Sequence, residues 1–487
     1  MRLTGILLPI FSLPNSYGIG TLGKEAYQFV DFLNNAKQSY WQVLPIGPTS
    51  YGDSPYQSFS SFAGNPYFID LDTLQEEGLL AKHEYEHLFD ESLQIDYGKL
   101  YATRYKVLQL AFSRFDLSRL NAFEQENHDW LEDYALFMSI KDHYNGASFL
   151  EWDDAFKLRE EQTIAKFKKE HLDEINFWKF LQYEFFKQWN ALKTYANSKD
   201  IKIIGDMPIY TALDSADVWS DPSQFLLDKD LKPVLVAGCP PDYFSPKGQL
   251  WGNPIYNYKK MKENGYEWWI RRVELAHQLF DVIRIDHFRG FEAYYAIPFG
   301  DEDATGGKWH KGPNTSLFKA INKKLGDIDI IAENLGFITP SVEKMLNILK
   351  YPGMKILQFG FDPNGDSDSM PHNLSYNNVA YPGTHDNPPI SSWYQTLSDE
   401  EKRFVHEYLD FDNPYEIGNK VINATLASVC YLAIIPFYDY LQKGSEARIN
   451  TPSQLGGNWM WRMDKNDMNQ DLCRYIARKT VLYRRNK

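Results

Sequence analysis

Short apolar segments recur along this chain, and each one stops at polar residues next to a glycine or a proline. Three of them end in an acidic residue: DVIRIDHFRG carries Asp286, IDIIAENLG carries Glu333 and NNVAYPGTHDNPP carries Asp386. A strand that is apolar throughout, without alternation, is covered on both faces, as in parallel α/β sheets. Carboxylates at the ends of several such strands converge only if the sheet closes into a barrel or opens a crevice. The sequence therefore predicts a parallel α/β fold with acidic residues gathered at one rim.

The order of the segments predicts an α/β fold of the (β/α)8 TIM-barrel type. Strand and helix patterns alternate with short loops at the start of the chain, which is typical of a parallel sheet. A length of 487 residues allows a barrel of roughly 250 residues plus large insertions. We expect a helix at 24–35 and strands at 5–14, 39–47, 201–210, from 281, at 327–334, 353–361, 377–385 and 428–440.

Two long segments interrupt the predicted barrel. We expect residues 48–200 to form a largely helical subdomain inserted after the second strand, because most of this segment has helical spacing and no strand period. Residues 211–258 are rich in proline, glycine and aromatic residues, which predicts an inserted aromatic loop or subdomain after the third strand. The whole chain, 1–487, is then a single barrel with insertions and no C-terminal β-sandwich.

Composition narrows the class of protein. The formal charge is −14, which argues against binding to nucleic acid or to an anionic membrane. Cys239, Cys430 and Cys473 are far apart and form no zinc-binding spacing, so a reducing cytoplasm is expected. Arg2 and the apolar residues after it resemble a short signal peptide, but Pro9 interrupts the run and predicts a first barrel strand instead.

Gly18–Gly23 reads GIGTLG and matches the GxGxxG pattern of dinucleotide-binding loops between a strand and a helix. That fingerprint also needs an acidic residue about 20 positions further on, at the end of the next strand, to bind the ribose. The next predicted strand, WQVLPIGP, offers none. The sequence therefore favours a tight structural turn or a sugar-contacting loop, and no cofactor is expected.

Each acidic residue at a strand end has a structural alternative when it is taken alone. Arg284 and Asp286 point to the same side of their strand, which suits either a nucleophile held ionised or an ordinary ion pair. Glu333 is either a general acid or a carboxylate at a helix N-terminus, and Asp386 is either a site residue or an Asx turn. Asp206 in IIGDMPIY suits either a supporting role or a buried residue that only collects hydrogen bonds. Together they indicate glycosidic-bond chemistry, which uses convergent carboxylates.

Four of these segments, GDMPIY, DVIRIDHFRG, IIAENLG and GTHDNPP, resemble the signature regions of the α-amylase-like superfamily of retaining glycosidases. Three longer segments narrow the resemblance: SYWQVLPIGPTSYGDSPYQSFSSFAGNPYFIDL, PPDYFSPKGQLWGNPIYNY and ARINTPSQLGGNWMWR. They are similar to the 4-α-glucanotransferases of glycoside hydrolase family 77, also called amylomaltases or disproportionating enzymes. The resemblance covers nearly the whole chain.

The resemblance implies a role for each acidic residue. Asp286 is the expected nucleophile, Glu333 the general acid and base, and Asp386 the stabiliser of the transition state. Arg284 is expected to orient the nucleophile. The other implied substrate-binding residues are Tyr56, Asp206, Tyr243, Phe244, Trp251, Asn253, His287, His385 and Asn450.

The aromatic members of this set are expected to cover the bound sugar. Tyr56 resembles the residue over the donor sugar, and Tyr243, Phe244 and Trp251 resemble a lid over the acceptor side. Transfer outcompetes hydrolysis only when a sugar hydroxyl reaches the intermediate before water does, so a covering loop favours transfer. For Trp251 the alternative is ordinary packing within the loop.

The resemblance also implies the partners. Maltooligosaccharides and starch- or glycogen-type α-1,4-glucans are the expected substrates, glucose is an expected acceptor, and no metal is required. The oligomeric state is left open between a monomer and a weak dimer. Two alternatives remain: a hydrolase of the α-amylase type, which usually carries a calcium site and a β-sandwich, and a glucan-binding scaffold without catalysis, which would not need the three carboxylates.

Overall fold

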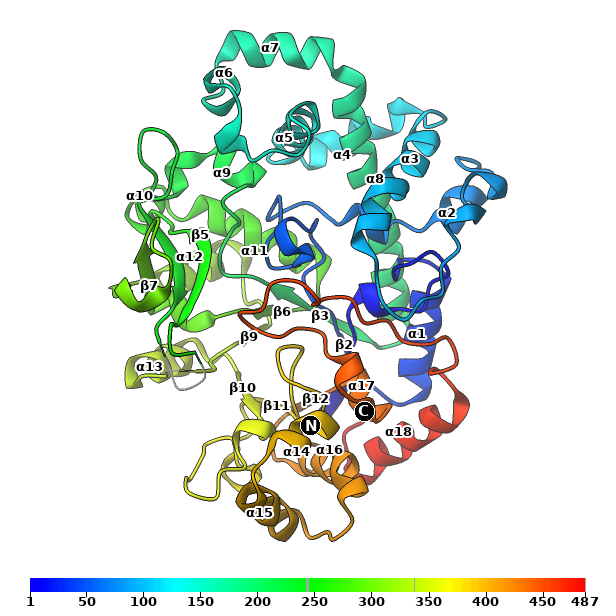
Figure 1. Cartoon of the computed structure of the whole chain (residues 1–487), viewed down its shortest axis with the longest axis vertical. Coiled ribbons are helices and arrows are strands. Elements are labelled where there is room, and N and C mark those ends of the chain that lie inside the picture. Colours follow the sequence, from blue (N-terminus) through cyan, green and yellow to red (C-terminus); the bar gives the residue numbers. More distant parts are fainter. Residues whose placement is uncertain (242–244, 337, 487) are drawn as a thin grey trace.

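A closed barrel of eight parallel strands forms the centre of the molecule (Figure 1). The computed structural model describes residues 1–241, 245–336 and 338–486. The predicted (β/α)8 fold is confirmed, and each barrel strand overlaps the segment predicted for it. In chain order the barrel strands are β1 (Leu3–Leu7), β2 (Tyr40–Gln42), β3 (Lys202–Met207), β6 (Val282–Ile285), β9 (Ile330–Ala332), β10 (Gly353–Ile356), β11 (Asn378–Tyr381) and β12 (Leu432–Pro436).

The barrel interior is apolar and leads directly to the polar rim. Ile204 on β3 and Val282 on β6 belong to the buried cluster that fills the barrel. Successive side chains of a strand alternate between its two faces. Asp206 and Arg284, two residues further along the same strands, therefore also face inward, and the strand register pairs them directly. The same alternation that builds the core thus delivers charged side chains to the carboxyl end of the barrel.

Helices surround the barrel. Their apolar stripes pack against the strands, as in α1, where Phe29, Val30 and Leu33 are fully buried. The helices around the barrel are α1 (Lys24–Asn35), α8 (Leu172–Ser198), α11 (Glu267–Leu279), α12 (Thr315–Leu325), α13 (Pro340–Leu349), α14 (Ile390–Thr396), α15 (Asp399–Leu409), α16 (Ile417–Ala427), α17 (Phe437–Tyr440) and α18 (Gln470–Leu482).

The segment between β2 and β3 is helical and extends away from the barrel (Figure 1). Its last helix, α8, is the longest, and it runs from this extension back to the start of β3. The other helices of the segment are α2 (Leu71–Glu76), α3 (Tyr97–Phe112), α4 (Leu120–Glu126), α5 (Leu131–His143), α6 (Asp154–Lys157) and α7 (Glu161–Glu170).

A small antiparallel sheet lies beside the barrel, and the sequence patterns did not reveal it. It joins strands from two connections, one between β3 and β6 and the other between β6 and β9, in the order β5-β4-β7-β8. Helices α9 (Ala216–Ser220) and α10 (Tyr258–Glu263) flank its first two strands in the chain. The strands are β4 (Leu235–Cys239), β5 (Gln249–Pro254), β7 (Ala293–Pro298) and β8 (Lys308–Lys311).

The glycine-rich segment before α1 is a tightly packed turn. A Cβ atom on Gly20 would lie 1.9 Å from the carbonyl oxygen of Ile10, and one on Gly23 would lie 2.1 Å from a carboxylate oxygen of Asp70. Both contacts are far shorter than van der Waals distance, so only glycine fits at these positions. The structure thus agrees with the interpretation of GIGTLG as a structural turn.

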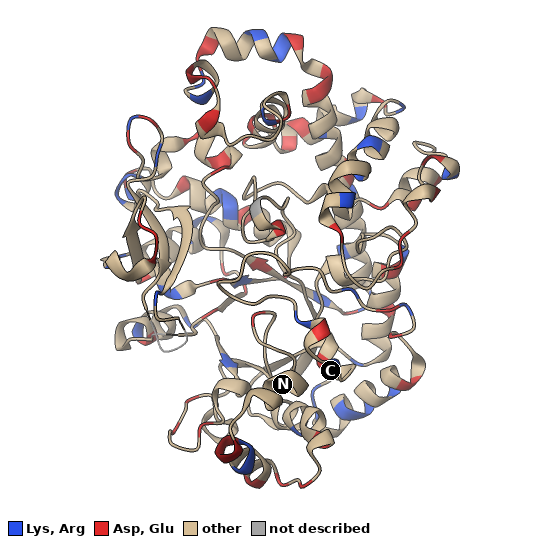
Figure 2. Cartoon of the chain, viewed as in Figure 1, with Lys and Arg blue, Asp and Glu red and all other residues tan. Residues whose placement is uncertain are grey.

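Charged residues of both signs are mixed along the outer helices. Figure 2 shows basic and acidic residues side by side on α7 and α15. Within the described residues, no helix combines the length and the apolar character that crossing a membrane requires.

Candidate active site

Charged side chains meet where the barrel strands end, and Arg284 lies at their centre. Its Nη1 atom is 2.5 Å from both carboxylate oxygens of Asp206 and 3.3 Å from Oδ1 of Asp286. Its Nη2 atom donates to Oε2 of Glu333 at 2.9 Å. The Arg284 side chain is only 2% exposed. One buried guanidinium therefore holds three carboxyl groups that the sequence analysis had associated with one another.

The protein compensates for burying Arg284 by surrounding it with carboxylates. Burial acts against the charge, but Asp206 and Glu333 outweigh it, so the pKa of Arg284 lies well above its ordinary value. Asp206 is fully enclosed, and burial raises its pKa, an effect that Arg284 and His385 partly offset. A buried ion pair of this kind tolerates no loss of a partner, since an unpaired charge would remain.

Asp286 and Glu333 are hydrogen-bonded to one another and share the charge of Arg284. Burial and the negative charge of Glu333 raise the pKa of Asp286 well above its ordinary value. Burial opposes ionisation of Glu333 too, but Arg284 and the hydrogen bonds from Asp286 and His287 lower its pKa to about 2. With no sugar bound, the pair therefore favours its shared proton on Asp286, whose pKa is raised, over Glu333, whose pKa is lowered. Such a pair titrates as a unit.

His287 fixes Glu333 from the backbone. Its N–H donates to Oε2 of Glu333 at 2.7 Å, and its own backbone is left-handed, with φ of 45°. Such a conformation is strained for a residue other than glycine and is often found at functional sites. Burial lowers the pKa of the imidazole to about 4, so His287 is neutral at neutral pH. The ring of Trp251 packs edge-on against it, with ring centres 4.9 Å apart.

Asp386 lies on the loop after β11 and is the most open of the predicted carboxylates, with a side chain that is 38% exposed. Asn450 Nδ2 donates to its Oδ1 at 2.7 Å, and Nε2 of His385 is 3.3 Å from its Oδ2. The His385 side chain is only 1% exposed. The carboxylate of Asp386 is thus oriented from two sides and remains accessible.

Tyr56 connects the two groups of carboxylates. Its hydroxyl donates to Oδ2 of Asp206 at 2.8 Å and lies 2.8 Å from Nε2 of His385. Its ring stacks on His385 with an interplanar angle of 15°. Trp459, which the sequence analysis did not single out, packs against both rings. Trp459 belongs to the segment GGNWMWR, and no spacing pattern in that segment indicates which of its tryptophans reaches the site.

Gln57, another residue that was not predicted, holds the segment that carries Trp251 and Asn253. Its Nε2 donates to the carbonyl oxygen of Trp251 at 3.3 Å and to Oδ1 of Asn253 at 3.2 Å. Asn253 is buried and donates to the carbonyl oxygen of Thr211. The structure thus places Asn253 among the contacts that hold strand β5 against the barrel. Tyr243 and Phe244 lie outside the described residues.

The structure brings most of the predicted site residues together. Among the described residues, no group of three or more His, Cys, Asp and Glu side chains has an arrangement that could hold a metal ion. The assembled groups are two hydrogen-bonded carboxyls, a third carboxylate that is accessible, a neutral imidazole and aromatic rings around them. This arrangement can donate a proton, attack an electrophilic carbon and bind sugar hydroxyls.

Comparisons with known proteins agree with this chemistry. The family model for 4-alpha-glucanotransferases, glycoside hydrolase family 77, matches residues 8–468. The chain is 49% identical to a 4-alpha-glucanotransferase of Clostridium butyricum over 98% of this chain and 99% of that one. It is 45% identical to the Thermus thermophilus enzyme of the same name, over 95% of each chain.

Solved structures give the same result. An amylomaltase from Streptococcus agalactiae, determined in complex with acarbose, superposes with a TM-score of 0.98 at 43% identity over the full length of both chains. An amylomaltase from Corynebacterium glutamicum shares the fold, with a TM-score of 0.79 at 17% identity, over 99% of this chain and 74% of that one. The chain belongs to glycoside hydrolase family 77, the family of 4-alpha-glucanotransferases.

Proposed function

We propose that the enzyme moves α-1,4-glucan segments from one maltooligosaccharide or glucan to another with retention of configuration, through a covalent bond to Asp286. The observation that carries this proposal is the contact of one buried guanidinium, that of Arg284, with both Asp286 and Glu333. Retaining glycosidases need two carboxyl groups close enough for one to attack carbon while the other serves the leaving oxygen.

In the first step, Glu333 gives its proton to the glycosidic oxygen while a carboxylate oxygen of Asp286 attacks the anomeric carbon. The bond from this carbon to the glycosidic oxygen breaks, and the shorter sugar leaves with the proton. In the second step, a hydroxyl of the acceptor sugar attacks the same carbon, Glu333 takes the hydroxyl proton, and Asp286 is released. The donor's glucan segment ends on the acceptor and the enzyme is regenerated.

This mechanism requires the proton of the resting pair to change position. Without sugar, the raised pKa of Asp286 and the lowered pKa of Glu333 favour the proton on Asp286. As the sugar binds, the proton must pass from Asp286 to Glu333, so that Glu333 can donate it to the glycosidic oxygen and the Asp286 carboxylate can attack the carbon. We expect the carboxyl groups to lie about 5–5.5 Å apart in the sugar complex, as retention requires. A crystal structure with bound acarbose measures this, and a separation beyond about 6.5 Å contradicts retention.

The other residues bind the sugar in the strained form that precedes bond cleavage. We propose that Asp386 accepts hydrogen bonds from two neighbouring sugar hydroxyls, and its contacts with Asn450 and His385 together with its exposure support this role. In the free enzyme, the Tyr56 hydroxyl is hydrogen-bonded to Asp206 and to His385. A sugar that binds to these two residues takes over those hydrogen bonds, so Tyr56 must turn aside and cover it.

The substrates follow from the relatives. The S. agalactiae amylomaltase was solved with acarbose. We infer that maltooligosaccharides and starch- or glycogen-type glucans are the donors here, and that glucose serves as an acceptor. We propose that Trp251 keeps water from the intermediate, as its contact with the ring of His287 supports. The cytoplasm, where such sugars are turned over, is the inferred location.

Incubation with maltotriose, followed by chromatography, tests the proposal. Disproportionation gives glucose together with a ladder of longer glucans, while total reducing ends stay constant. Hydrolysis gives only glucose and maltose, and reducing ends increase. The Asp286→Asn variant is the matched control because it keeps the shape of the side chain. A ladder that persists in this variant contradicts the role of Asp286.

A further inference from the structure

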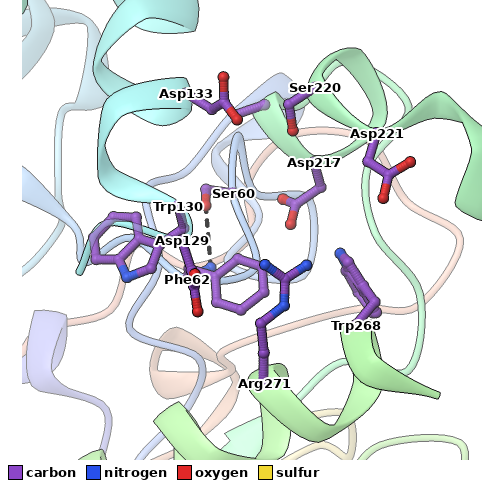
Figure 3. A pocket seen from close by; sticks show the side chains of 11 residues that line it. Ser60, Phe62, Asp129, Trp130, Asp133, Asp217, Ser220, Asp221, Trp268 and Arg271 are labelled. Carbon is purple, nitrogen blue, oxygen red and sulfur yellow. Dashed lines mark hydrogen bonds between the residues drawn. The ribbon is translucent and has the colours of Figure 1, made fainter. Parts of the chain in front are cut away.

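A polar cavity of about 250 Å³ lies outside the barrel mouth (Figure 3). Its walls come from the start of α5 in the helical extension, from α9 after β3 and from α11 before β6. Phe62 forms its floor in Figure 3, and Asp217, Trp268 and Arg271 surround the open space. None of these three residues belongs to the site described above.

The cavity is lined by a buried hydrogen-bond donor that has no partner among the described residues. Trp268 is only 3% exposed, and it lines the cavity beside Arg271. Arg271 forms no ion pair with any described residue, and its Nε atom is buried without a partner. The neighbouring Arg272 contrasts with it, because its guanidinium donates to the carbonyl oxygens of Pro208 and Ile209. Unpartnered buried donors are costly, so a ligand that accepts hydrogen bonds is expected here.

The same cavity also presents acceptors. Asp217 is 5% exposed, and one of its carboxylate oxygens accepts the N–H of Ser61 at 2.8 Å. Figure 3 shows the Asp217 carboxylate and the Arg271 guanidinium facing each other, and they lie beyond ion-pair distance. The nearby Asp133 is already paired with Arg159 at 2.6 Å. The cavity is thus lined by a donor group and by an acceptor group that do not pair with one another.

These features fit a sugar ring better than an ion. A cation would leave the buried Nε donor of Arg271 unsatisfied and would meet its positive charge, and an anion would meet the carboxylate of Asp217. A hydroxyl both donates and accepts, so a polyol satisfies both kinds of group. The aromatic walls suit the apolar face of a pyranose. The volume of about 250 Å³ is below the range of about 300–1,000 Å³ for drug-sized ligands and suits one hexose rather than a glucan chain.

We propose that this cavity is a second sugar site that binds a single glucose unit, with Arg271 and the Trp268 N–H donating to its hydroxyls and Asp217 accepting from them. The site is connected to the active site through the chain. Ser60 and Phe62 also line a second cavity that reaches Tyr56 and Asp206. Glucose in the cavity therefore contacts the segment that follows Tyr56.

The Trp268 indole resonance reports binding directly. In ¹⁵N-tryptophan-labelled enzyme saturated with acarbose, which blocks the barrel mouth, the resonance of Trp268 is identified by its absence in the Trp268→Phe variant. We expect added glucose to shift this resonance in a saturable way. No shift up to 100 mM glucose, or an equal shift with glycerol, overturns the proposal.

The Arg271→Met variant tests the ligand contacts. It removes the donors and keeps the length of the side chain, and a hydrogen bond to a charged group contributes enough that glucose should bind about tenfold more weakly or worse. The other tryptophan resonances verify that this variant is folded. Arg474→Met on α18, where the side chain is 72% exposed, is the matched control and should bind glucose as the unmodified enzyme does. Equal affinity in Arg271→Met and in this control overturns the proposed contacts. Both experiments measure glucose binding alone, so neither depends on catalysis at the barrel site.

Discussion

Arg284 determines the charge balance of the active site. If Asp206, Asp286 and Glu333 were all ionised, the single positive charge of the buried Arg284 would face three negative charges. One proton retained on the Asp286–Glu333 pair halves the negative charge that remains after Arg284 has neutralised one carboxylate. The pair can then pass this proton to a substrate and recover it. Two carboxyl groups with different surroundings can in this way serve as acid and nucleophile.

Replacing Arg284 by lysine should therefore damage catalysis although the charge is kept. A lysine ammonium cannot reach Asp206, Asp286 and Glu333 in the fixed directions of a guanidinium fork. We expect kcat for maltotriose disproportionation to fall by about 10²-fold or more, a loss comparable to removing one positioned donor. Arg474→Lys, at an exposed ion pair on α18, should leave kcat unchanged. A normal kcat in Arg284→Lys contradicts the central role of the guanidinium.

His287 should make the folded state sensitive to acid. Burial lowers its pKa to about 4, whereas the unfolded chain has a value of about 6.5. Between these values the unfolded state binds more protons, so stability falls as the pH is lowered from about 6.5 to 4. The urea midpoint should decline less over this range in His287→Gln than in the unmodified enzyme. His83→Gln, at an exposed position, is the control. If the urea midpoint changes equally with pH in all three proteins, the prediction is contradicted.

At the scale of elements, α17 holds the loop that carries Asp386. The hydroxyl of Tyr438 donates to the carbonyl oxygen of Thr384 at 3.0 Å, and Oδ1 of Asp439 accepts the N–H of Ile390 at 2.9 Å. The two ends of the loop are thus fixed by neighbouring residues of one short helix. The second oxygen of Asp439 is buried without a partner.

Asp439→Asn should stabilise the enzyme at alkaline pH. Burial raises the pKa of Asp439 to about 8, above about 3.9 in the unfolded chain. The folded state therefore binds more protons between these values, and stability falls as the pH rises through about 8. Asparagine keeps the oxygen that accepts from Ile390 and removes the charge. The Tm advantage of the variant should grow from pH 5 to pH 9 and reach about 3 °C. Asp471→Asn, at an 89% exposed side chain, should show no change of its Tm difference with pH. If the Tm difference between Asp439→Asn and the unmodified enzyme is the same at every pH, the prediction is contradicted.

Strand β5 carries Trp251 to the site, so truncation of this ring tests its role as a cover. In Trp251→Ala the ring against His287 and Tyr210 is lost. Water then competes better for the intermediate. We expect the ratio of hydrolysis to transfer, measured as new reducing ends per maltotriose consumed, to rise roughly fivefold. Phe299→Ala, at a 46% exposed residue after β7 of the same sheet, should keep the original ratio. An unchanged ratio in Trp251→Ala favours ordinary packing.

At the scale of the whole molecule, the barrel was predictable because its strands are buried on both faces and read as apolar runs. The rim was predictable because the runs of β6 and β9 end directly in Asp286 and Glu333. The antiparallel sheet was not, since β8 is exposed along its whole length and carries no apolar pattern. Contacts such as Tyr56 with Trp459 join distant segments, and only the folded chain reveals them. The predicted first strand, 5–14, was too long, because the strand ends at Leu7 before Pro9.

Helix α8 belongs to the helical extension and to the barrel at the same time, which makes the two parts depend on each other. It packs against α5 in the extension and against α1 and α11 beside the barrel. Trp189, in the half that faces the barrel, is fully buried, and its indole N–H donates to the carbonyl oxygen of Leu279 at 3.0 Å. Its ring also packs against Phe280, just before β6. A helix shared in this way should transmit a local loss of packing to both parts.

Trp189→Ala should therefore destabilise the extension and the barrel together. Removing a buried tryptophan costs about 3–5 kcal/mol. If the two parts form one cooperative unit, the most protected amides of α5 and of β3 should lose the same amount of free energy of exchange. Native-state hydrogen exchange with mass spectrometry measures both segments in one experiment. Leu172→Ala, at the 55% exposed start of the same helix, should leave both unchanged. Loss of protection in β3 alone, with α5 unaffected, would mean that the extension folds independently and that α8 serves only as a linker.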